Sequence, residues 1–350
     1  YKKWWAQYRM QWFGHKKAIG QIIISYTDGT SEIIKTDETW KFSDGPIVYN
    51  CVYDGEIYDA RLEQKGWCET GFNDSGWEQV NVFKKLSARL ESHTMPAVEV
   101  VQTIKPIELK PYGNCRLFDM EQNFSGWVRI KVSGEKGTKI KIRFAEDIHA
   151  DGTIDVSSNE NAKATAEYIL KGEGVEIYEP RFTYFGFKYA EISSENGSFD
   201  LHDIEGCVVH TDNKQVGEFY CDNDLVNKIH RATVWSQKSN MLGYPMDCPQ
   251  RDERLGWFGD AQVTADEAMF NFDMAQFYEN WFEGIKDNQD EKTGDLPIIS
   301  PQPYIWDEGV EWSSTYFTML WQYYLYYGDK QILVRHYPNL KRYMQFLDSI

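Results

Sequence analysis

The 350-residue chain is short of basic residues: 37 Lys and Arg stand against 54 Asp and Glu, a formal net charge of −17. This imbalance argues against binding of nucleic acid or an anionic membrane through bulk electrostatics. The sequence also lacks any run of about eighteen apolar residues, the length that a membrane-spanning helix needs. We therefore expect neither a nucleic-acid partner nor a membrane partner.

Paired cysteines and a leader sequence are missing too. The six cysteines are scattered without a C-x-x-C pair, which favours reduced, mostly buried thiols over a disulfide framework or a zinc site and leaves a single disulfide open. The first residues have no apolar core or small-residue cleavage site and resemble the interior of a domain, so we expect the natural N-terminus to be missing. The compartment stays unknown. The sequence leans weakly toward the cytoplasm and leaves the periplasm open. A homodimer is also left open.

Aromatic residues are abundant at 15% of the chain, with 13 Trp and 22 Tyr. Such residues suit large cores, and they also suit sugar-binding surfaces, where a flat ring packs on C–H groups. The length allows two or three domains.

The first two hundred residues have the alternation and turn signals of β-strands. Residues 21–36 are two β-branched runs around Asp28-Gly29, a strong hairpin signal. Alternating apolar residues recur over 127–144, and 182–192 is an aromatic-rich strand region. We predict two β-sandwich modules, 1–95 and 96–205, joined near residues 90–102.

From residue 206 onward the period becomes helical. The expected helices are 222–240, 261–270, 275–289, 312–329 and one that begins at 339. The first starts at a capping Asp222 or Asn223 and places Leu225, Ile229 and Ala232 on one face. Phe277, Trp281 and Ile285 lie four apart in the third, and Gly328 suits the C-cap of the fourth. We predict that 206–350 is the first part of an all-α domain, and that the native protein continues past Ile350.

Residues 246–260, MDCPQRDERLGWFGD, gather four acids, two arginines and a tryptophan. Pro245 and Pro249 favour extended or turn backbone, and Gly256 and Gly259 let the backbone pass close to another group. A carboxylic acid beside an indole suits a glycosidase, in which the acid protonates the leaving oxygen.

The charge around this stretch has a consequence for the ligand. Between Asp247 and Glu311 there are 16 acids and 4 basic residues, a net of −12. Such a segment favours a ligand that is neutral or that becomes positive during the reaction, as an oxocarbenium-like transition state does. Residues 303–316 add Trp306, Asp307 and Trp312, which could line the same pocket.

Each of these features also has a structural interpretation. Asp252, Glu253 and the two arginines form a solvated ion-pair loop in that interpretation. Asp260 caps the following helix, Trp312 belongs to the core, and Cys248 is a small buried apolar residue. Spacing alone favours these interpretations.

The stretch DCPQRDERLGWFGDAQ (247–262) resembles the signature of bacterial α-L-rhamnosidases, glycoside hydrolase family 78. Other segments that resemble the family's N-terminal β-modules are 53–67, 118–132, 143–155 and 179–192. The resemblance covers essentially the whole chain. The fold that it implies is multidomain, with N-terminal β-sandwich modules followed by the first helices of an (α/α)6 barrel that is incomplete in this chain.

The resemblance also implies roles for individual residues. Glu253 matches the general acid, which would have to stay protonated near neutrality. Asp247, Arg251 and Asp260 match polar residues that hold rhamnose hydroxyls, and Trp257 matches an aromatic residue of the pocket. Trp312 matches a further pocket tryptophan less closely, and Trp306 and Asp307 are placed only by proximity.

The resemblance implies an inverting α-L-rhamnosidase that removes terminal non-reducing α-L-rhamnose from glycosides or polysaccharides. Inversion needs a second carboxylate to activate water, and the family places that general base beyond Ile350, so the chain alone is expected to be inactive. We predict no cofactor and no metal for the catalytic chemistry. The alternatives are a non-catalytic rhamnose-binding protein on the same scaffold and, more weakly, another barrel glycosidase or a polysaccharide lyase. The acidic loop argues against a lyase.

Overall fold

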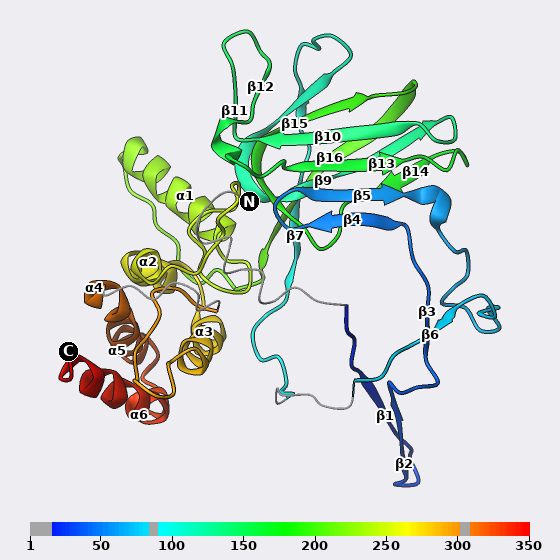
Figure 1. Cartoon of the computed structure of the whole chain (residues 1–350). Coiled ribbons are helices and arrows are strands. Elements are labelled where there is room, and N and C mark those ends of the chain that lie inside the picture. The colour runs from blue at the N-terminus through cyan, green and yellow to red at the C-terminus, as the bar shows by residue number, and fades with distance from the viewer. Residues whose placement is uncertain (1–15, 84–89, 302–308) are drawn as a thin grey trace. The chain divides into compact units, whose positions relative to one another are not determined.

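The computed structural model describes residues 16–83, 90–301 and 309–350 (Figure 1). The chain divides into two compact units. The larger comprises Ile47–Arg61 and Thr94–Ile350, and the smaller comprises the described parts of Lys2–Pro46 and Leu62–His93.

The smaller unit contains two short two-stranded sheets. Strands β1 (Gln21–Ser25) and β2 (Ser31–Lys35) form an antiparallel hairpin in which Ile23 pairs with Ile33. The turn between them has Gly29 at a φ of 85°, a backbone conformation that glycine adopts without steric cost. The predicted hairpin is confirmed. Strands β3 (Lys41–Phe42) and β6 (Glu78–Gln79) form the second pair.

The larger unit contains one ten-stranded, strongly bent sheet. Its main path runs β4-β5-β13-β10-β15-β9-β16-β7, and β8 and β14 pair with β9. The bounds are β4 Ile47–Cys51, β5 Gly55–Asp59, β7 Val98–Ile104, β8 Ile107–Glu108, β9 Arg116–Gly134, β10 Lys139–Ala145, β13 Thr165–Ile169, β14 Glu176–Tyr178, β15 Phe185–Ser194 and β16 Phe199–Thr211. Short additional elements are β11 Asp147–Ile148, β12 Ile154–Asp155, and the 3-10 helices η2 Ala60–Leu62 and η3 Ser157–Asn159.

Strand β9 has different partners along its two halves. Its first half pairs with β15, and from Gly126 onward it pairs with β16. A Cβ atom on Gly126 would lie 1.9 Å from the carbonyl oxygen of Cys207, so only glycine fits at this change of partner. The sheet encloses an apolar core and confirms a β-sandwich, whereas the division into two sandwich modules stays a prediction.

The sequence alternation determines which side chains fill that core. Ile140, Ile142 and Phe144 on β10 are fully buried, while the intervening residues are only partly buried. Phe144 stacks on Phe185 of β15, with ring centroids 4.1 Å apart. The predicted strands in 127–144 and 182–192 are therefore confirmed.

Strands β4 and β5 lie within the predicted module 1–95 but belong to the large sheet, because β5 pairs in parallel with β13. This pairing joins segments more than a hundred residues apart, which no local signal reveals. The domain boundaries at residues 95 and 205 stay predictions.

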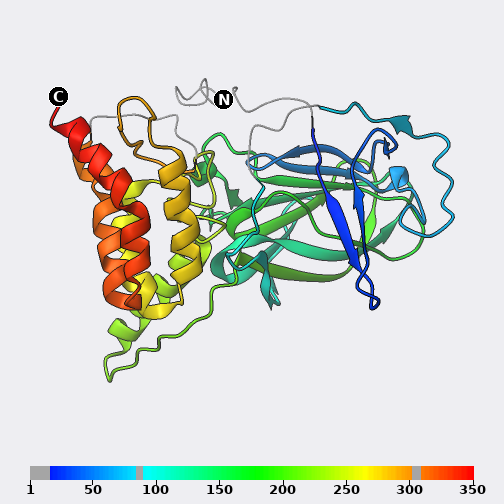
Figure 2. The same ribbon diagram turned by 90° about the horizontal axis from the view of Figure 1, so that it is seen from below.

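Among the described residues, six helices follow the sheet: α1 Asp224–Ser239, α2 Phe258–Asn271, α3 Ala275–Asp287, α4 Val310–Ser313, α5 Thr315–Tyr327 and α6 Lys330–Leu347. Figure 2 shows α3, α5 and α6 side by side, and each of the three pairs is in contact. Phe277, Trp281 and Ile285 are buried in this helical core as predicted. Asn223 caps α1, and Gly328 ends α5 at a left-handed φ of 67°.

Three details of the helix predictions are wrong. Helix α6 begins at Lys330, where Asp329 caps it, and it continues through Pro338. The bond that Pro338 cannot donate would reach the carbonyl of Val334, whose side chain is on the exposed face of the helix. Helix α2 begins at Phe258, three residues before the predicted start. The predicted apolar face of α1 is exposed, with Leu225 at 65% and Ile229 at 58%.

No described helix combines the length and the apolar character that crossing a bilayer requires. All six cysteines are free, so the disulfide that the sequence left open is absent.

We predict that Phe185→Ala lowers the unfolding free energy by about 3–5 kcal/mol, because a large buried ring leaves a cavity. Val175→Ala, at a residue 59% exposed on the same sandwich, should change it by no more than about 0.5 kcal/mol. Urea unfolding of both variants followed by tryptophan fluorescence makes the comparison. Equal effects would contradict the described core.

Candidate active site

The charged stretch between α1 and α2 forms a closed loop. The Asp247 backbone N–H donates to the Leu255 carbonyl at 3.1 Å, and the Leu255 N–H donates to Asp247 Oδ1 at 2.7 Å. These two bonds join the ends of the loop, so the intervening residues are held at a fixed place. The Tyr244 hydroxyl adds a third bond, to the Arg254 carbonyl at 3.0 Å.

Glycines let the loop pass close to its neighbours, as the sequence predicted. A Cβ atom on Gly256 would lie 1.8 Å from the Ser300 carbonyl oxygen, and one on Gly259 would lie 3.1 Å from the Trp312 indole. The Ser300 N–H donates to the Gly256 carbonyl at 3.0 Å. The start of α2 is thereby fixed against the segment that follows α3.

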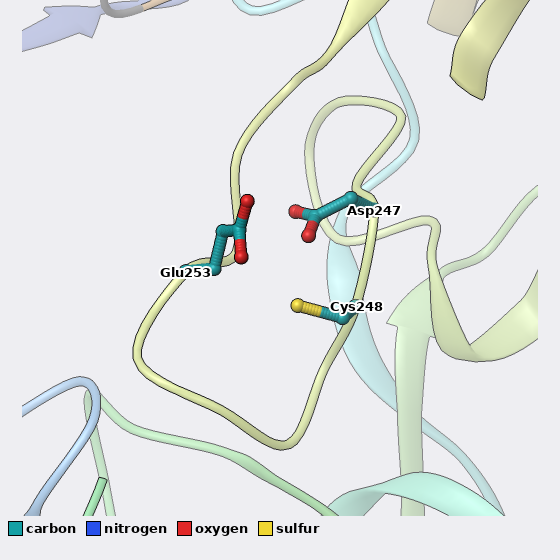
Figure 3. Close-up of side chains that lie close together, drawn as sticks. All are labelled: Asp247, Cys248 and Glu253. Atoms are coloured by element: carbon teal, nitrogen blue, oxygen red, sulfur yellow. The ribbon is translucent and has the colours of Figure 1, made fainter. Parts of the chain in front are cut away.

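The loop directs two carboxyl groups and a thiol into one space. Figure 3 shows the side chains of Asp247, Cys248 and Glu253 pointing toward one another from the two arms of the loop. The Glu253 side chain is 11% exposed, and its Oε1 accepts a hydrogen bond from Trp257 Nε1 at 3.0 Å. Glu253 therefore lies beside Asp247 and Trp257 in a largely buried position.

Arg251 supplies the positive charge for this cluster. Its Nη2 lies 3.0 Å from Glu253 Oε2 and 3.6 Å from Asp247 Oδ2. Its Nη1 reaches Glu160 Oε1 at 3.2 Å, and its Nε donates to the Cys248 sulfur at 3.4 Å. One guanidinium thus contacts every acidic or thiol group of the cluster.

The environment raises the pKa of Asp247 above its usual value. Burial is the largest cause, the negative charge of Glu253 adds to it, and Arg251 opposes both. Asp247 Oδ2 has no hydrogen-bond partner within the described residues. A buried acceptor without a partner is costly and rare, so this oxygen is suited to accept a bond from a ligand.

The cluster also has the composition of a cation site, since ligand atoms of Asp247, Cys248 and Glu253 lie within 4.8 Å of one another. One feature disfavours a metal ion there: the Arg251 guanidinium already compensates the two acids. Burial and the Asp247 charge raise the pKa of the Cys248 thiol to about 12. The predicted absence of a catalytic metal stays a prediction. Cys248 is buried as expected.

The predicted aromatic residues lie together. Trp257 and Trp312 form an edge-to-face pair with ring centroids 5.3 Å apart, and Trp312 in α4 also packs against the helical core. The core interpretation of Trp312 is confirmed, and its role in a sugar pocket stays a prediction.

Asp260 lies in the first turn of α2 and does not cap it, because the N-cap position is Trp257. Burial and the Glu253 charge raise the pKa of the Asp260 carboxyl. The capping interpretation is wrong. Trp306 and Asp307 lie outside the described residues.

The interpretation of the charged stretch as a solvated loop is wrong as well. Asp252 is 1% exposed and Arg254 is 2% exposed. Both side chains face the sandwich, where Asn161 Nδ2 donates to Asp252 at 3.1 Å and Arg254 donates to the carbonyl of Tyr184 at 2.8 Å. Their partners are 70 or more residues away in the chain, so sequence spacing gave no signal for them.

Buried carboxyl groups beside two indoles, at the start of a helical domain that follows a β-sandwich, are typical of a glycoside hydrolase. Comparison with known protein families agrees with this class. Three domain families match in succession: the α-L-rhamnosidase N-terminal domain over residues 1–102, the bacterial α-L-rhamnosidase concanavalin-like domain over 111–210, and the bacterial α-L-rhamnosidase 6 hairpin glycosidase domain over 214–349.

Individual relatives agree. An α-L-rhamnosidase structure from Dictyoglumus thermophilum is 47% identical, with a TM-score of 0.90 over 95% of this chain and 38% of that one. One from Streptomyces avermitilis, complexed with L-rhamnose, is 33% identical, with a TM-score of 0.88 over 95% of this chain and 32% of that one. A curated α-L-rhamnosidase of Formosa agariphila is 35% identical over 92% of this chain and 36% of its own length.

The chain belongs to the bacterial α-L-rhamnosidase family, glycoside hydrolase family 78, and the resemblance found in the sequence is confirmed. The chain spans about a third of the length of the curated relatives that it matches.

We predict that Gly256→Ala lowers the unfolding free energy by about 1–3 kcal/mol, because the added methyl group would overlap the Ser300 carbonyl. Gly76→Ala is the matched control, since a Cβ atom there meets nothing within 4 Å. Thermal and urea unfolding measure both. A Gly256→Ala protein as stable as the control would show that the loop does not pass Ser300 as described.

Asp247→Asn should change the pH dependence of stability. A carboxyl whose pKa is raised in the folded protein binds more protons there than in the unfolded chain. Stability therefore falls as the pH rises above 3.8, the ordinary pKa of an aspartate. The unfolding free energy of the unaltered protein minus that of Asp247→Asn should therefore decrease as the pH rises from about 4 to 7, with a slope no steeper than about 1.4 kcal/mol per pH unit. Urea unfolding across this range gives the difference, and a rise would contradict the buried placement of Asp247.

Proposed function

We propose that the full-length protein containing this chain is an α-L-rhamnosidase that removes terminal non-reducing α-L-rhamnose from glycosides or polysaccharides, with Glu253 as the general acid. The observation that carries the proposal is the buried Glu253 carboxyl, held between the Trp257 indole and the Arg251 guanidinium at 3.0 Å from each. Family membership supports the same activity.

Glu253 donates its proton to the oxygen that links rhamnose to the leaving group. Trp257 and Arg251 each direct a donor at one of its two oxygens. Donors in these positions stabilise the carboxylate that remains after the proton has left, which assists proton transfer in the transition state. They also hold the carboxyl in one orientation, so the proton is delivered to a fixed position.

The neighbouring groups bind the sugar. Asp247 Oδ2 is buried without a hydrogen-bond partner among the described residues, with Arg251 Nη2 at 3.6 Å, and accepts a bond from a rhamnose hydroxyl. Arg251, which still has 35% of its side chain exposed, and Asp260 provide further polar contacts. The Trp257–Trp312 pair offers an apolar wall for the C–H groups and the methyl group of a 6-deoxy sugar.

The reaction inverts the anomeric configuration and needs a second carboxylate to activate water on the opposite face of the sugar. We expect this base in a later part of the helical barrel, beyond Ile350, as the family resemblance implies. The activity is therefore a property of the full-length protein. No step of the scheme requires a cofactor.

The Glu253→Gln substitution in the full-length protein tests whether Glu253 is the general acid, because the loss of activity should then depend on the leaving group of the substrate. We expect kcat/KM to fall by about 10²- to 10⁴-fold for a rhamnoside with a poor, alkyl leaving group. The 2,4-dinitrophenyl rhamnoside should lose much less, because its leaving group departs without protonation. Steady-state kinetics on both substrates measure the ratio.

Glu291→Gln is the control, because Glu291 is exposed in a loop outside the cluster. If the Glu253→Gln protein hydrolyses the alkyl rhamnoside at the normal rate, the assignment is wrong. Rhamnose binding without turnover by the unaltered full-length protein would favour the non-catalytic alternative.

A further inference from the structure

We infer that the β-sandwich positions the general acid: Arg254, with help from Asp252, fastens the segment that carries Glu253 to three separate parts of the sandwich. The inference rests on the proposed role of Glu253. It assigns a positioning function to two residues that do not face the carboxyl cluster, and it makes the sandwich an integral part of the active site.

Arg254 is the centre of this attachment. Its Nη1 donates to the carbonyl of Val52 at 2.6 Å and to that of Tyr184 at 2.8 Å. The guanidinium lies 4.6 Å from the ring centroid of Tyr184 and 5.4 Å from that of Tyr53. Val52 and Tyr53 lie between β4 and β5, and Tyr184 immediately precedes β15, so one side chain joins two sandwich segments to the loop.

The remaining donors of Arg254 hold the loop itself. Nε donates to the Arg251 carbonyl at 3.2 Å and Nη2 to the Gln250 carbonyl at 3.5 Å. No carboxylate forms an ion pair with Arg254 in the ranges that the structure describes, so backbone carbonyls and ring faces compensate its buried charge. This pattern depends on a planar fork with several fixed donors, which lysine does not have.

The residues on either side of Arg254 bind the sandwich too. Asp252 accepts a bond from Asn161, which follows η3, at 3.1 Å. The backbone carbonyl of Glu253 accepts a bond from the Tyr53 hydroxyl at 3.2 Å. Three consecutive residues, 252 to 254, therefore each have a partner in the sandwich, and the general acid is the middle one.

Two further observations on the backbone, the φ angle of Arg254 and the close approach of β15 to the loop, support this attachment. Arg254 has a φ of +53°, a left-handed conformation that costs a non-glycine residue energy and persists where its surroundings hold it. Gly186 of β15 faces the loop so closely that a Cβ atom there would lie 2.7 Å from Pro249 Cγ. The loop is thus seated on the sandwich both by polar bonds and by close packing.

A general acid works only within hydrogen-bond reach of the oxygen that it protonates, and small displacements of catalytic groups cost large factors in rate. Losing the Arg254 contacts would let the 252–254 segment relax, while Asp247, on the other arm, keeps its own bonds to Leu255. The expected defect is therefore in proton delivery, with sugar binding much less affected.

The test uses Arg254→Lys and Arg254→Ala in the full-length protein, with a series of aryl and alkyl rhamnosides. We expect kcat/KM to fall by about 10- to 100-fold for the poorest leaving groups and by less than about threefold for 2,4-dinitrophenyl rhamnoside, because only the former need the acid. The KM for the activated substrate should change little. Methylguanidine should partly restore the Arg254→Ala protein on poor leaving groups.

Arg129→Ala is the matched control. Arg129 is an arginine of the same unit that binds Glu179 and Glu205, away from the loop, and its loss should leave the leaving-group dependence unchanged. Asn161→Ala, which removes the side-chain amide that donates to Asp252, is a milder second variant and should shift the dependence in the same direction as Arg254→Ala.

Equal losses on all substrates would show that Arg254 contributes only to stability and would overturn the inference, as would unchanged kinetics. Hydrogen–deuterium exchange provides a readout that does not depend on activity: exchange over 247–257 should increase in Arg254→Lys and Asn161→Ala but not in Arg129→Ala. If the unaltered protein hydrolyses no rhamnoside, the proposed function fails. Unchanged exchange in Arg254→Lys and Asn161→Ala would overturn the attachment itself.

Discussion

Arg251 places one guanidinium against the carboxyl groups of Glu253 and Asp247, at 3.0 and 3.6 Å. A carboxyl group in a poorly hydrated space loses solvation when it ionises, so negative charge that develops on either group needs a nearby cation. The arginine meets this requirement with directional donors, which also fix where each carboxylate points. The hydrogen bond from the Trp257 indole to Glu253 and the open acceptor position at Asp247 Oδ2 both belong to carboxyl groups whose charge Arg251 compensates.

The charged residues of the loop divide into two functional sets. Arg251 and Glu253 face the cluster, whereas Asp252 and Arg254 face the sandwich. This alternation lets four consecutive charged side chains be at least partly buried without competing for the same partner. It also explains how a loop can hold a reactive group rigidly: the side chains of Asp252 and Arg254 bind the sandwich on either side of Glu253, whereas the ends of the loop lead into helices.

Much of the fold and half of the site follow from local pattern. The hairpin at Asp28-Gly29, the alternation on β9 and β10 and the helical faces of α3 were predictable, because side-chain periodicity records which face is buried. The motif at 247–262 placed Asp247, Arg251, Glu253 and Trp257 in one loop, and these four residues do meet. Helix α6 shows the limit: the sequence predicted a start at 339, whereas the helix begins at Lys330 and buries Ile332 and His336 in its first turns.

The sequence by itself determined the family, the order of sandwich and helices, and the loop that carries the carboxyl groups. Only the tertiary structure decided the roles of Asp252 and Arg254, whose charges looked like solvated surface, and the membership of β4 and β5 in the large sheet. The roles of Asp252 and Arg254 depend on Val52, Asn161 and Tyr184, which lie 70 to 202 residues from their partners, and the place of β5 in the sheet depends on its pairing with the distant β13. Contacts at that separation leave no periodicity or spacing in the chain, because folding alone brings the segments together.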